Sequence, residues 1–131
     1  MIDPLTLCLA AMLSVEAGGE IDMREKVAMI QTAQSRQRIN AEYPNNNYFA
    51  GGSTNLCDIV THRQWYGPGG WDMLLKVEYS DRFYSIVALV EFVLTHELPL
   101  IADGAPCFRT ARGTKDAVVV NKHEFGWYCM Y

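Results

Sequence analysis

The spacing of apolar residues changes once along this chain, near Gly104, and this change constrains the fold more than any other feature. Before it, apolar residues recur at steps of three and four, which is typical of amphipathic helices. After it come three short segments rich in Val, Phe, Trp and Tyr, at 106–111, 117–121 and 123–130, separated by polar turns. The sequence therefore predicts a mostly helical α+β protein with a small antiparallel sheet at its C-terminal end.

The first predicted helix covers residues 4–17. Asp3 can cap it, and proline is favoured at its first position. The glycine pair 18–19 ends it, because glycine readily takes the left-handed conformation found at helix ends. Glu16 is thereby placed at the exit of an apolar helix, directly before two residues that lack side chains.

Two longer helices are predicted over 22–40 and 81–97. Asp22 begins the first of them, and Glu25 stands where the glutamate of a capping box reaches back to the cap. Pro99 closes the second. That second helix is the most apolar of the chain, so we expect it to be the central helix of the core.

Length and composition indicate one globular domain over residues 1–131. Half of the residues are apolar and a fifth are charged. A chain of this length buries roughly two thirds of the surface that its unfolded form exposes. The loop-prone stretches at 43–47 and 67–70 are therefore predicted to lie within this domain, and a short helix is predicted over 71–77.

Charge and hydropathy exclude two classes of partner. The chain has 11 Lys and Arg against 15 Asp and Glu, a net charge of −4 with no basic stripe, so we expect no nucleic acid as a partner. The longest apolar stretches, 7–13 and 86–94, are shorter than the roughly 20 residues that span a bilayer, so we expect no membrane insertion. No cationic region precedes the first apolar run, which predicts that there is no signal peptide.

The cysteines and histidines do not form a metal-binding pattern. The four cysteines are widely spaced: Cys8, Cys57, Cys107 and Cys129. Neither His-Glu pair, at 96–97 or 123–124, has a second histidine at the spacing of a metalloprotease helix, so we expect no metal and no cofactor. Buried thiols are the expected state of the cysteines. The pair to test for a disulfide is Cys107 with Cys129, because these residues fall in segments predicted to be neighbouring strands.

Glu16 is the strongest candidate for chemistry. A carboxyl held against apolar neighbours has its charged form disfavoured, so its pKa rises and it can donate a proton near neutral pH. The general acid of a glycosidase needs this property. On composition alone, the commoner role of such a residue is a solvated glutamate at a helix end. Glu20, four residues further on, has the alternative role of accepting hydrogen bonds from loop amides.

A cysteine peptidase is the second chemical hypothesis, with Cys57 as its nucleophile. On a helix, His62 lies about 140° around the axis from Cys57, so the two do not share a face. His96 or His123 would then have to approach Cys57 in space to serve as the base.

Five segments between residues 5 and 130 form an ordered set of motifs. Residues 16–20 read Glu-Ala-Gly-Gly-Glu, and residues 26–36 form the helical segment that follows. Residues 56–66 contain Cys-Asp-Ile-Val and then Gln-Trp-Tyr, residues 104–108 read Gly-Ala-Pro-Cys-Phe, and residues 123–125 read His-Glu-Phe. Together they resemble the cell wall hydrolase family that includes the spore-cortex-lytic enzymes of sporulating bacteria. The family motif at the first segment is Glu-Ala-Arg-Gly-Glu, so Gly18 replaces an arginine.

This resemblance implies a lysozyme-like fold related to the lytic transglycosylases. It implies cleavage of the β-1,4 bond between N-acetylmuramic acid and N-acetylglucosamine in peptidoglycan. Glu16 would be the catalytic residue, first as acid and then as base, which gives a 1,6-anhydro-muramoyl end without a water nucleophile. The resemblance also leads us to expect that Gln64, Tyr66 and Glu20 hold the sugar and that Phe108 forms the wall of the cleft.

Two other functions stay open on the sequence. One is a non-catalytic structural or wall-binding subunit of a phage particle, and the other is the Cys57-dependent peptidoglycan peptidase. The expected partners are glycan strands of peptidoglycan, together with phage virion or lysis proteins. The expected location is the host cytoplasm or a phage virion, from which the domain acts on the cell wall.

Overall fold

The structure, a computed structural model, describes residues 1–17, 22–65, 72 and 76–130. Its elements in chain order are α1 (Pro4–Ala17), α2 (Met23–Glu42), the 3-10 turn η1 (Ala50–Gly52), α3 (Leu56–Thr61), α5 (Asp81–Thr95), β1 (Cys107–Thr110), β2 (Val118–Val120), β3 (His123–Gly126) and the 3-10 turn η2 (Tyr128–Met130). The predicted α+β class is confirmed. The short helix predicted over 71–77 lies for the most part outside the described residues. Among the helices of the described ranges, none is both long enough and apolar enough to cross a membrane.

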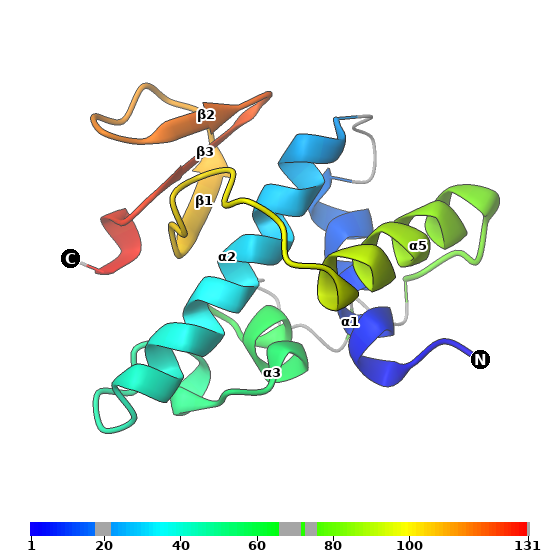
Figure 1. Ribbon diagram of the computed structural model, residues 1–131, viewed down its shortest axis with the longest axis horizontal. Helices are drawn as coiled ribbons and strands as arrows, with labels where there is room; N and C mark the ends of the chain where they lie inside the picture. The colour runs from blue at the N-terminus through cyan, green and yellow to red at the C-terminus, as the bar shows by residue number, and fades with distance from the viewer. Residues whose placement is uncertain (18–21, 66–71, 73–75, 131) are drawn as a thin grey trace.

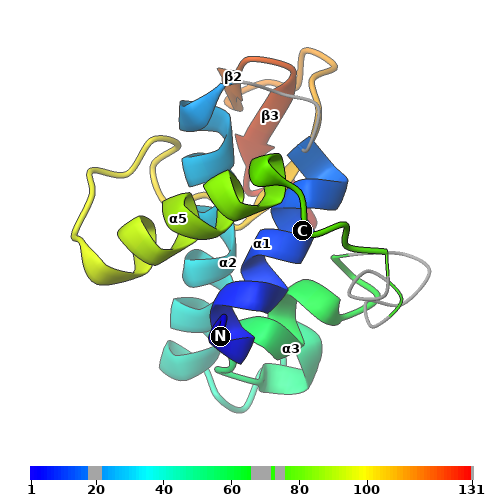
Figure 2. The same cartoon turned by 90° about the vertical axis from the view of Figure 1, so that its right-hand side faces the viewer.

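Helix α2 lies between two parts of the molecule. It contacts α1, α3 and α5, and it also contacts strands β1 and β2. Figure 1 shows α2 crossing the molecule diagonally, with the sheet along one side and the other helices along the opposite side. In Figure 2, α1 runs through the middle of the helical part, and its C-terminal end lies toward the sheet. This arrangement brings the end of α1 near the strands.

The helix starts follow the sequence prediction, with one correction. Asp3 Oδ2 accepts hydrogen bonds from the backbone N–H groups of Leu5 and Thr6, at 3.1 and 3.2 Å. Asp22 Oδ1 accepts one from the N–H of Glu25 at 3.0 Å. The predicted capping-box role of the Glu25 side chain is wrong, because its carboxylate is fully buried and bonds to residues of the sheet region instead.

The central helix of the core is α1, and the prediction that the helix over 81–97 has this place is wrong. Residues 8–13 are buried on every side of α1, each with at most 3% of its surface exposed. Helix α5 buries one face and exposes Tyr84 and Phe92 on the other. Small side chains explain the difference, because Ala10 and Ala11 let neighbouring elements pack closely against α1.

The three strands form a sheet of order β1-β3-β2, and both pairs are antiparallel. In this register Phe108 lies opposite Phe125, and Thr110 lies opposite His123. Because side chains alternate along a strand, these four residues share one face, while Glu124 belongs to the other. Phe125 is fully buried in the core, so the shared face is the one turned toward the helices.

Glu124 organises the opposite face of the sheet. Its fully buried carboxylate accepts hydrogen bonds from Arg109 Nε at 3.0 Å and from the backbone N–H of Arg112 at 2.8 Å. The Thr114 hydroxyl, followed by these two groups, lowers the pKa of Glu124 to about 2. The carboxylate therefore holds the turn that follows β1 against the sheet.

Two disulfides connect the elements. Cys8 of α1 is bonded to Cys57 of α3, and Cys107 of β1 is bonded to Cys129 of η2, with Cα–Cα distances of 5.4 and 5.9 Å. The expectation of free buried thiols is therefore wrong, whereas the pair singled out for a test, Cys107 with Cys129, is confirmed. Cys8 and Cys57 are 49 residues apart, and only the packing of α1 on α3 brings them together.

We expect the Cys8–Cys57 disulfide to stabilise the protein more than the Cys107–Cys129 disulfide does. Their sequence separations are 49 and 22 residues, and the chain-entropy relation gives about 4 and about 3 kcal/mol for loops of these lengths. Each pair is replaced by two alanines, and the free energy of unfolding is measured in urea. An equal or larger loss of stability in the variant that lacks the Cys107–Cys129 disulfide would contradict the prediction.

Candidate functional site

Three of the predicted site residues line one cavity, whose volume is about 270 Å³. Its lining residues are Glu16, Arg36, Gln64, Trp65, Phe108, Arg109, Thr110 and His123. They come from the end of α1, from α2, from the segment after α3 and from strands β1 and β3. The fold thus brings Glu16, Gln64 and Phe108 to one cavity. Glu20 and Tyr66 lie outside the described residues.

Glu16 is the one carboxylic acid among the described residues that line this cavity. It occupies the last turn of α1 and is partly buried. Burial raises its pKa above the ordinary value, and the nearby His123 partly offsets this shift. The protonated form of Glu16 is therefore favoured, so the side chain can serve as a proton donor.

A second glutamate holds His123 in place. Glu25 Oε2 lies 3.1 Å from Nδ1 of His123 and also accepts a hydrogen bond from the backbone N–H of Lys122 at 3.0 Å. In this contact Nδ1 is the donor when it carries the ring proton, because a carboxylate oxygen accepts. Glu25, His123 and Glu16 thus form a series in which a fully buried carboxylate orients an imidazole, and the imidazole interacts electrostatically with the cavity acid.

Arg36 contributes a buried positive charge to the same cavity. Its guanidinium carbon lies 4.5 Å from the ring centre of Phe49 and 4.7 Å from that of Trp65, so the group interacts with two aromatic rings. Its Nε donates a hydrogen bond to the carbonyl of Pro106 at 2.7 Å. Burial lowers the pKa of Arg36 to about 10, which still leaves it charged at neutral pH.

Aromatic side chains form one wall of the cavity. The ring centres of Trp65 and Phe108 are 5.2 Å apart, and Phe108 also packs edge-on against His123 at 5.8 Å. Phe108 therefore lies where a cleft wall was predicted. Gln64 is exposed at the cavity, and its Oε1 accepts a hydrogen bond from the backbone N–H of Ala50 at 2.9 Å, which leaves its amide NH₂ group to face a ligand.

Sequence reasoning missed the roles of three residues. Glu25 was expected to act within its own helix, and His123 was weighed only as a metal ligand or a peptidase base. Arg36 lies in the helical segment 26–36, which contributed to the family resemblance, but no role was predicted for it. The one sequence signal that could have indicated a role of His123 at the site was the His-Glu-Phe segment at 123–125. The contacts of Glu25 with Lys122 and His123 span 97 and 98 residues, and no local pattern encodes such contacts.

The proposed nucleophile of a cysteine peptidase is not free in this structure. Cys57 is bonded to Cys8, and a disulfide sulfur cannot act as a thiolate nucleophile. The structure therefore counts against the peptidase hypothesis.

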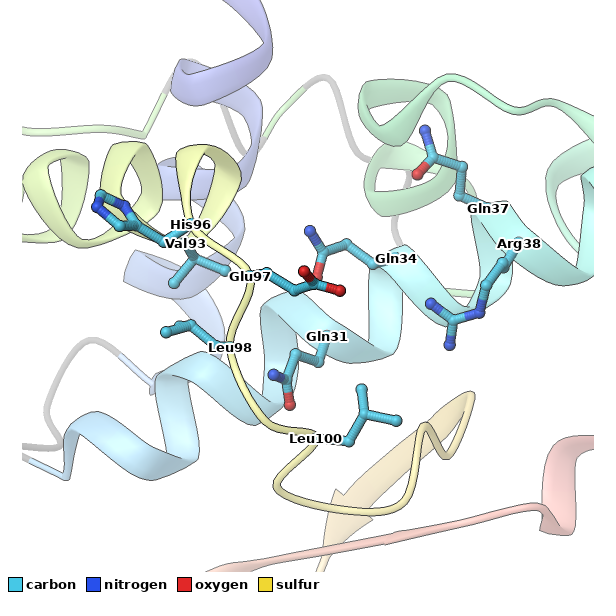
Figure 3. Close-up of a pocket in the computed structure, with 9 residues that line it drawn as sticks. All are labelled: Gln31, Gln34, Gln37, Arg38, Val93, His96, Glu97, Leu98 and Leu100. Carbon is cyan, nitrogen blue, oxygen red and sulfur yellow. The ribbon is translucent and has the colours of Figure 1, made fainter.

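A larger cavity, of about 520 Å³, lies between α2 and the segment that follows α5. Figure 3 shows side chains from both elements projecting into it. Gln31 there has a structural role, since its amide bonds to the carbonyl of Pro99 and the N–H of Ile101 at 2.9 and 3.0 Å. Arg38 at the same cavity donates to the hydroxyl of Ser35. The two bonds of Gln31 hold the segment after α5 on α2, whereas the Arg38–Ser35 bond lies within α2. These polar groups thus have structural partners, so this cavity is not the candidate site.

Within the described parts of the chain, no group of three or more His, Cys, Asp or Glu side chains could hold a metal ion. No protein-family model matches the sequence, and no curated protein or solved structure is significantly similar to it. The functional proposal therefore rests on the residues that line the smaller cavity, of about 270 Å³.

We expect Glu16→Gln to stabilise the protein at pH 7 but not at pH 4. Because the pKa of Glu16 is raised in the folded state, ionisation costs more in the fold than in the unfolded chain, and this cost grows as pH rises through the folded pKa. Near or below about pH 4 the side chain is mostly neutral in both states. Urea unfolding at both pH values measures the effect, and the exposed Glu42→Gln is the control. Equal stability of the Glu16→Gln variant and wild type at pH 7 contradicts the prediction.

We expect His123→Gln to raise the pKa of Glu16 further. The interaction with His123 lowers this pKa, so its removal leaves burial unopposed. NMR titration of protein with ¹³C-labelled glutamate side chains measures the value directly. The matched control is His96→Gln, since His96 is exposed at the end of α5 and does not line this cavity. An unchanged or lower pKa in the His123→Gln variant shows that the two groups are not coupled in this way.

Proposed function

We propose that this protein is a peptidoglycan lytic transglycosylase that cleaves the β-1,4 bond between N-acetylmuramic acid and N-acetylglucosamine. One observation carries the proposal: a carboxylic acid with a raised pKa lies at a cavity whose described lining contains no other carboxyl group. The wall made by Trp65 and Phe108 supports it, because aromatic faces pack against sugar rings. The volume of about 270 Å³ suits one sugar residue better than a long ligand.

The first step needs Glu16 in its protonated form. Glu16 donates its proton to the glycosidic oxygen as the bond between that oxygen and C1 of the muramoyl residue breaks. N-acetylglucosamine leaves with a hydroxyl group, and the muramoyl ring carries the positive charge of an oxocarbenium-like transition state. The aromatic wall and the amide of Gln64 hold the sugar while this happens.

The second step uses the carboxylate that the first step leaves. Glu16 takes the proton of the C6 hydroxyl of the muramoyl residue, and the C6 oxygen bonds to C1. This closes a 1,6-anhydro ring and restores protonated Glu16. The proton therefore returns to its donor, and a single carboxyl group serves as acid and then as base. A water nucleophile and the second carboxylate of ordinary glycosidases are not required.

His123 supports the change of charge on Glu16. Its interaction with Glu16 favours the carboxylate form, through which the reaction passes between the two steps. Glu25 contacts Nδ1 of the imidazole and fixes its orientation, so His123 does not need to reorganise. His123 and Glu25 are thus positioning residues, and Glu16 is the catalytic residue.

The proposed fold is lysozyme-like, with its acid at the end of the first helix and a small sheet beside it. The proposed site of action is an oxidising environment outside the cytoplasm, which suits a protein with two disulfides. A phage particle or lysis system would deliver the domain to the cell wall and so to this oxidising environment. The substrate there is the glycan strands of peptidoglycan.

We expect wild-type protein to release 1,6-anhydro-muramoyl fragments from purified peptidoglycan, and Glu16→Gln to reduce this rate by about 10²- to 10⁴-fold, the range of general acid–base catalysis. The rate should fall as pH rises through the raised pKa of Glu16, because only the protonated form starts the reaction. Mass spectrometry of the fragments identifies the product ends.

Glu42→Gln is the matched control and should retain full activity, since Glu42 is exposed at the end of α2. Hydrated reducing ends in place of anhydro ends would identify a muramidase. Free stem peptides would restore the peptidase hypothesis. Intact glycan with wild-type protein would contradict the proposal and favour a structural or wall-binding subunit.

A further inference from the structure

Arg36 differs from the other cation of the cavity in having no anionic partner. Arg109 pairs with Glu124, donates to the Thr114 hydroxyl at 2.7 Å and lies over the ring of Tyr128. Arg36 is only 6% exposed, and among the described residues its hydrogen bond to the carbonyl of Pro106 is the one that its side chain makes. No carboxylate of the described chain lies within ion-pair distance of it.

A guanidinium group has five N–H donors, and the described residues supply a hydrogen-bond acceptor to one of those of Arg36. Burying a charge without a partner is costly, and the two aromatic contacts offset only part of that cost. Glu16 lines the same cavity, but no ion pair of the described structure joins it to Arg36.

A second donor at the same cavity also has no partner. The indole N–H of Trp65 is buried and makes no hydrogen bond within the described structure, and Trp65 packs on the guanidinium of Arg36. Both residues line the cavity that contains Glu16. Two unmatched donors beside one cavity indicate that a ligand supplies the acceptor atoms.

We propose that Arg36 and Trp65 form a carboxylate-binding subsite next to Glu16. The aromatic rings of Phe49 and Trp65 hold the guanidinium group in place, and its planar set of donors matches the two oxygens of a carboxylate. The identity of the ligand rests on the proposed function: the carboxylate is one carried by the muramoyl residue. It is either the lactyl carboxylate of a sugar without a stem peptide or a carboxylate of the stem peptide itself. This subsite distinguishes the muramoyl residue from N-acetylglucosamine, which has no carboxyl group.

The test compares the binding of three ligands to the wild-type protein at pH 7 by NMR titration. N-acetylmuramic acid has a free lactyl carboxylate, N-acetylglucosamine has none, and muramoyl dipeptide has its carboxylate on the peptide. We expect N-acetylmuramic acid, muramoyl dipeptide or both to bind about 10- to 100-fold more tightly than N-acetylglucosamine, as one charge-assisted contact predicts. Tight binding of N-acetylmuramic acid alone identifies the lactyl carboxylate as the bound group. Tight binding of muramoyl dipeptide identifies a carboxylate of the stem peptide.

Variants of Arg36 assign the preference to this residue. Arg36→Gln should abolish it, and Arg36→Lys should retain part of it, because the lysine keeps the charge but loses the planar set of donors. Arg38→Gln is the control, since Arg38 is an exposed residue of the same helix outside this cavity. Thermal melting establishes that each variant is folded. If Arg36→Gln does not fold, the Arg36→Lys variant and the three wild-type affinities decide the question.

Equal affinity of the wild type for all three ligands overturns the inference, as does a preference that survives in a folded Arg36→Gln variant. These outcomes are separate from failure of the proposed function. Carboxylate-dependent binding without glycan cleavage contradicts the lytic activity alone. Cleavage to anhydro ends without any carboxylate preference contradicts the subsite alone.

Discussion

The buried carboxylate of Glu25 joins the helical part of the molecule to the sheet. It projects from the first turn of α2 and accepts hydrogen bonds from the backbone of Lys122 and from the imidazole of His123. The group is fully buried and only Oε2 has hydrogen-bond partners in the described structure, so separating the first turn of α2 from the start of β3 would leave a buried polar group without any partner. This contact places His123 beside the end of α1, and the candidate site depends on that placement.

Three glutamates of this chain have distinct environments, and the differences explain which of them can transfer a proton. Glu124 is surrounded by donors, which hold its pKa at about 2 and keep it ionised. Glu25 is engaged by the sheet and orients His123. Glu16 is partly buried at the end of α1 without comparable donors, so burial raises its pKa. Of these three glutamates, only Glu16 lines the cavity, so its carboxyl group is the one available for chemistry there.

Several poorly satisfied groups of the described structure line the cavity that contains Glu16, although another buried atom without a hydrogen-bond partner, Oε1 of Glu25, belongs to a residue outside that lining. Arg36 has no anionic partner within the described structure, the indole N–H of Trp65 has no acceptor there, and Glu16 is disfavoured as a carboxylate. Each of these features lowers the stability of the unliganded protein. A substrate that supplies a carboxylate and a basic oxygen would relieve them, which is the balance between stability and function expected of an active site. The two disulfides and the apolar core around α1 offset the cost.

Local patterns in the sequence were sufficient for the class of fold, the helix starts and the position of Glu16. The Asp3 and Asp22 caps act on residues two or three positions away, so a short window of sequence contains the whole interaction. The three strands were likewise predicted from alternation and turn residues, but the third is shorter than predicted: it ends at Gly126, and Tyr128–Met130 form a 3-10 turn. The environment of Glu16 could not be predicted in the same way, because it depends on His123, which is more than 100 residues away along the chain. The same holds for the Cys8–Cys57 bond and for the place of α1 at the centre of the core.

The sequence by itself determined which segments are helices and strands and which acid ends the first helix. Only the tertiary structure decided what surrounds that acid, because burial and charge at a site are set by distant residues that packing brings together.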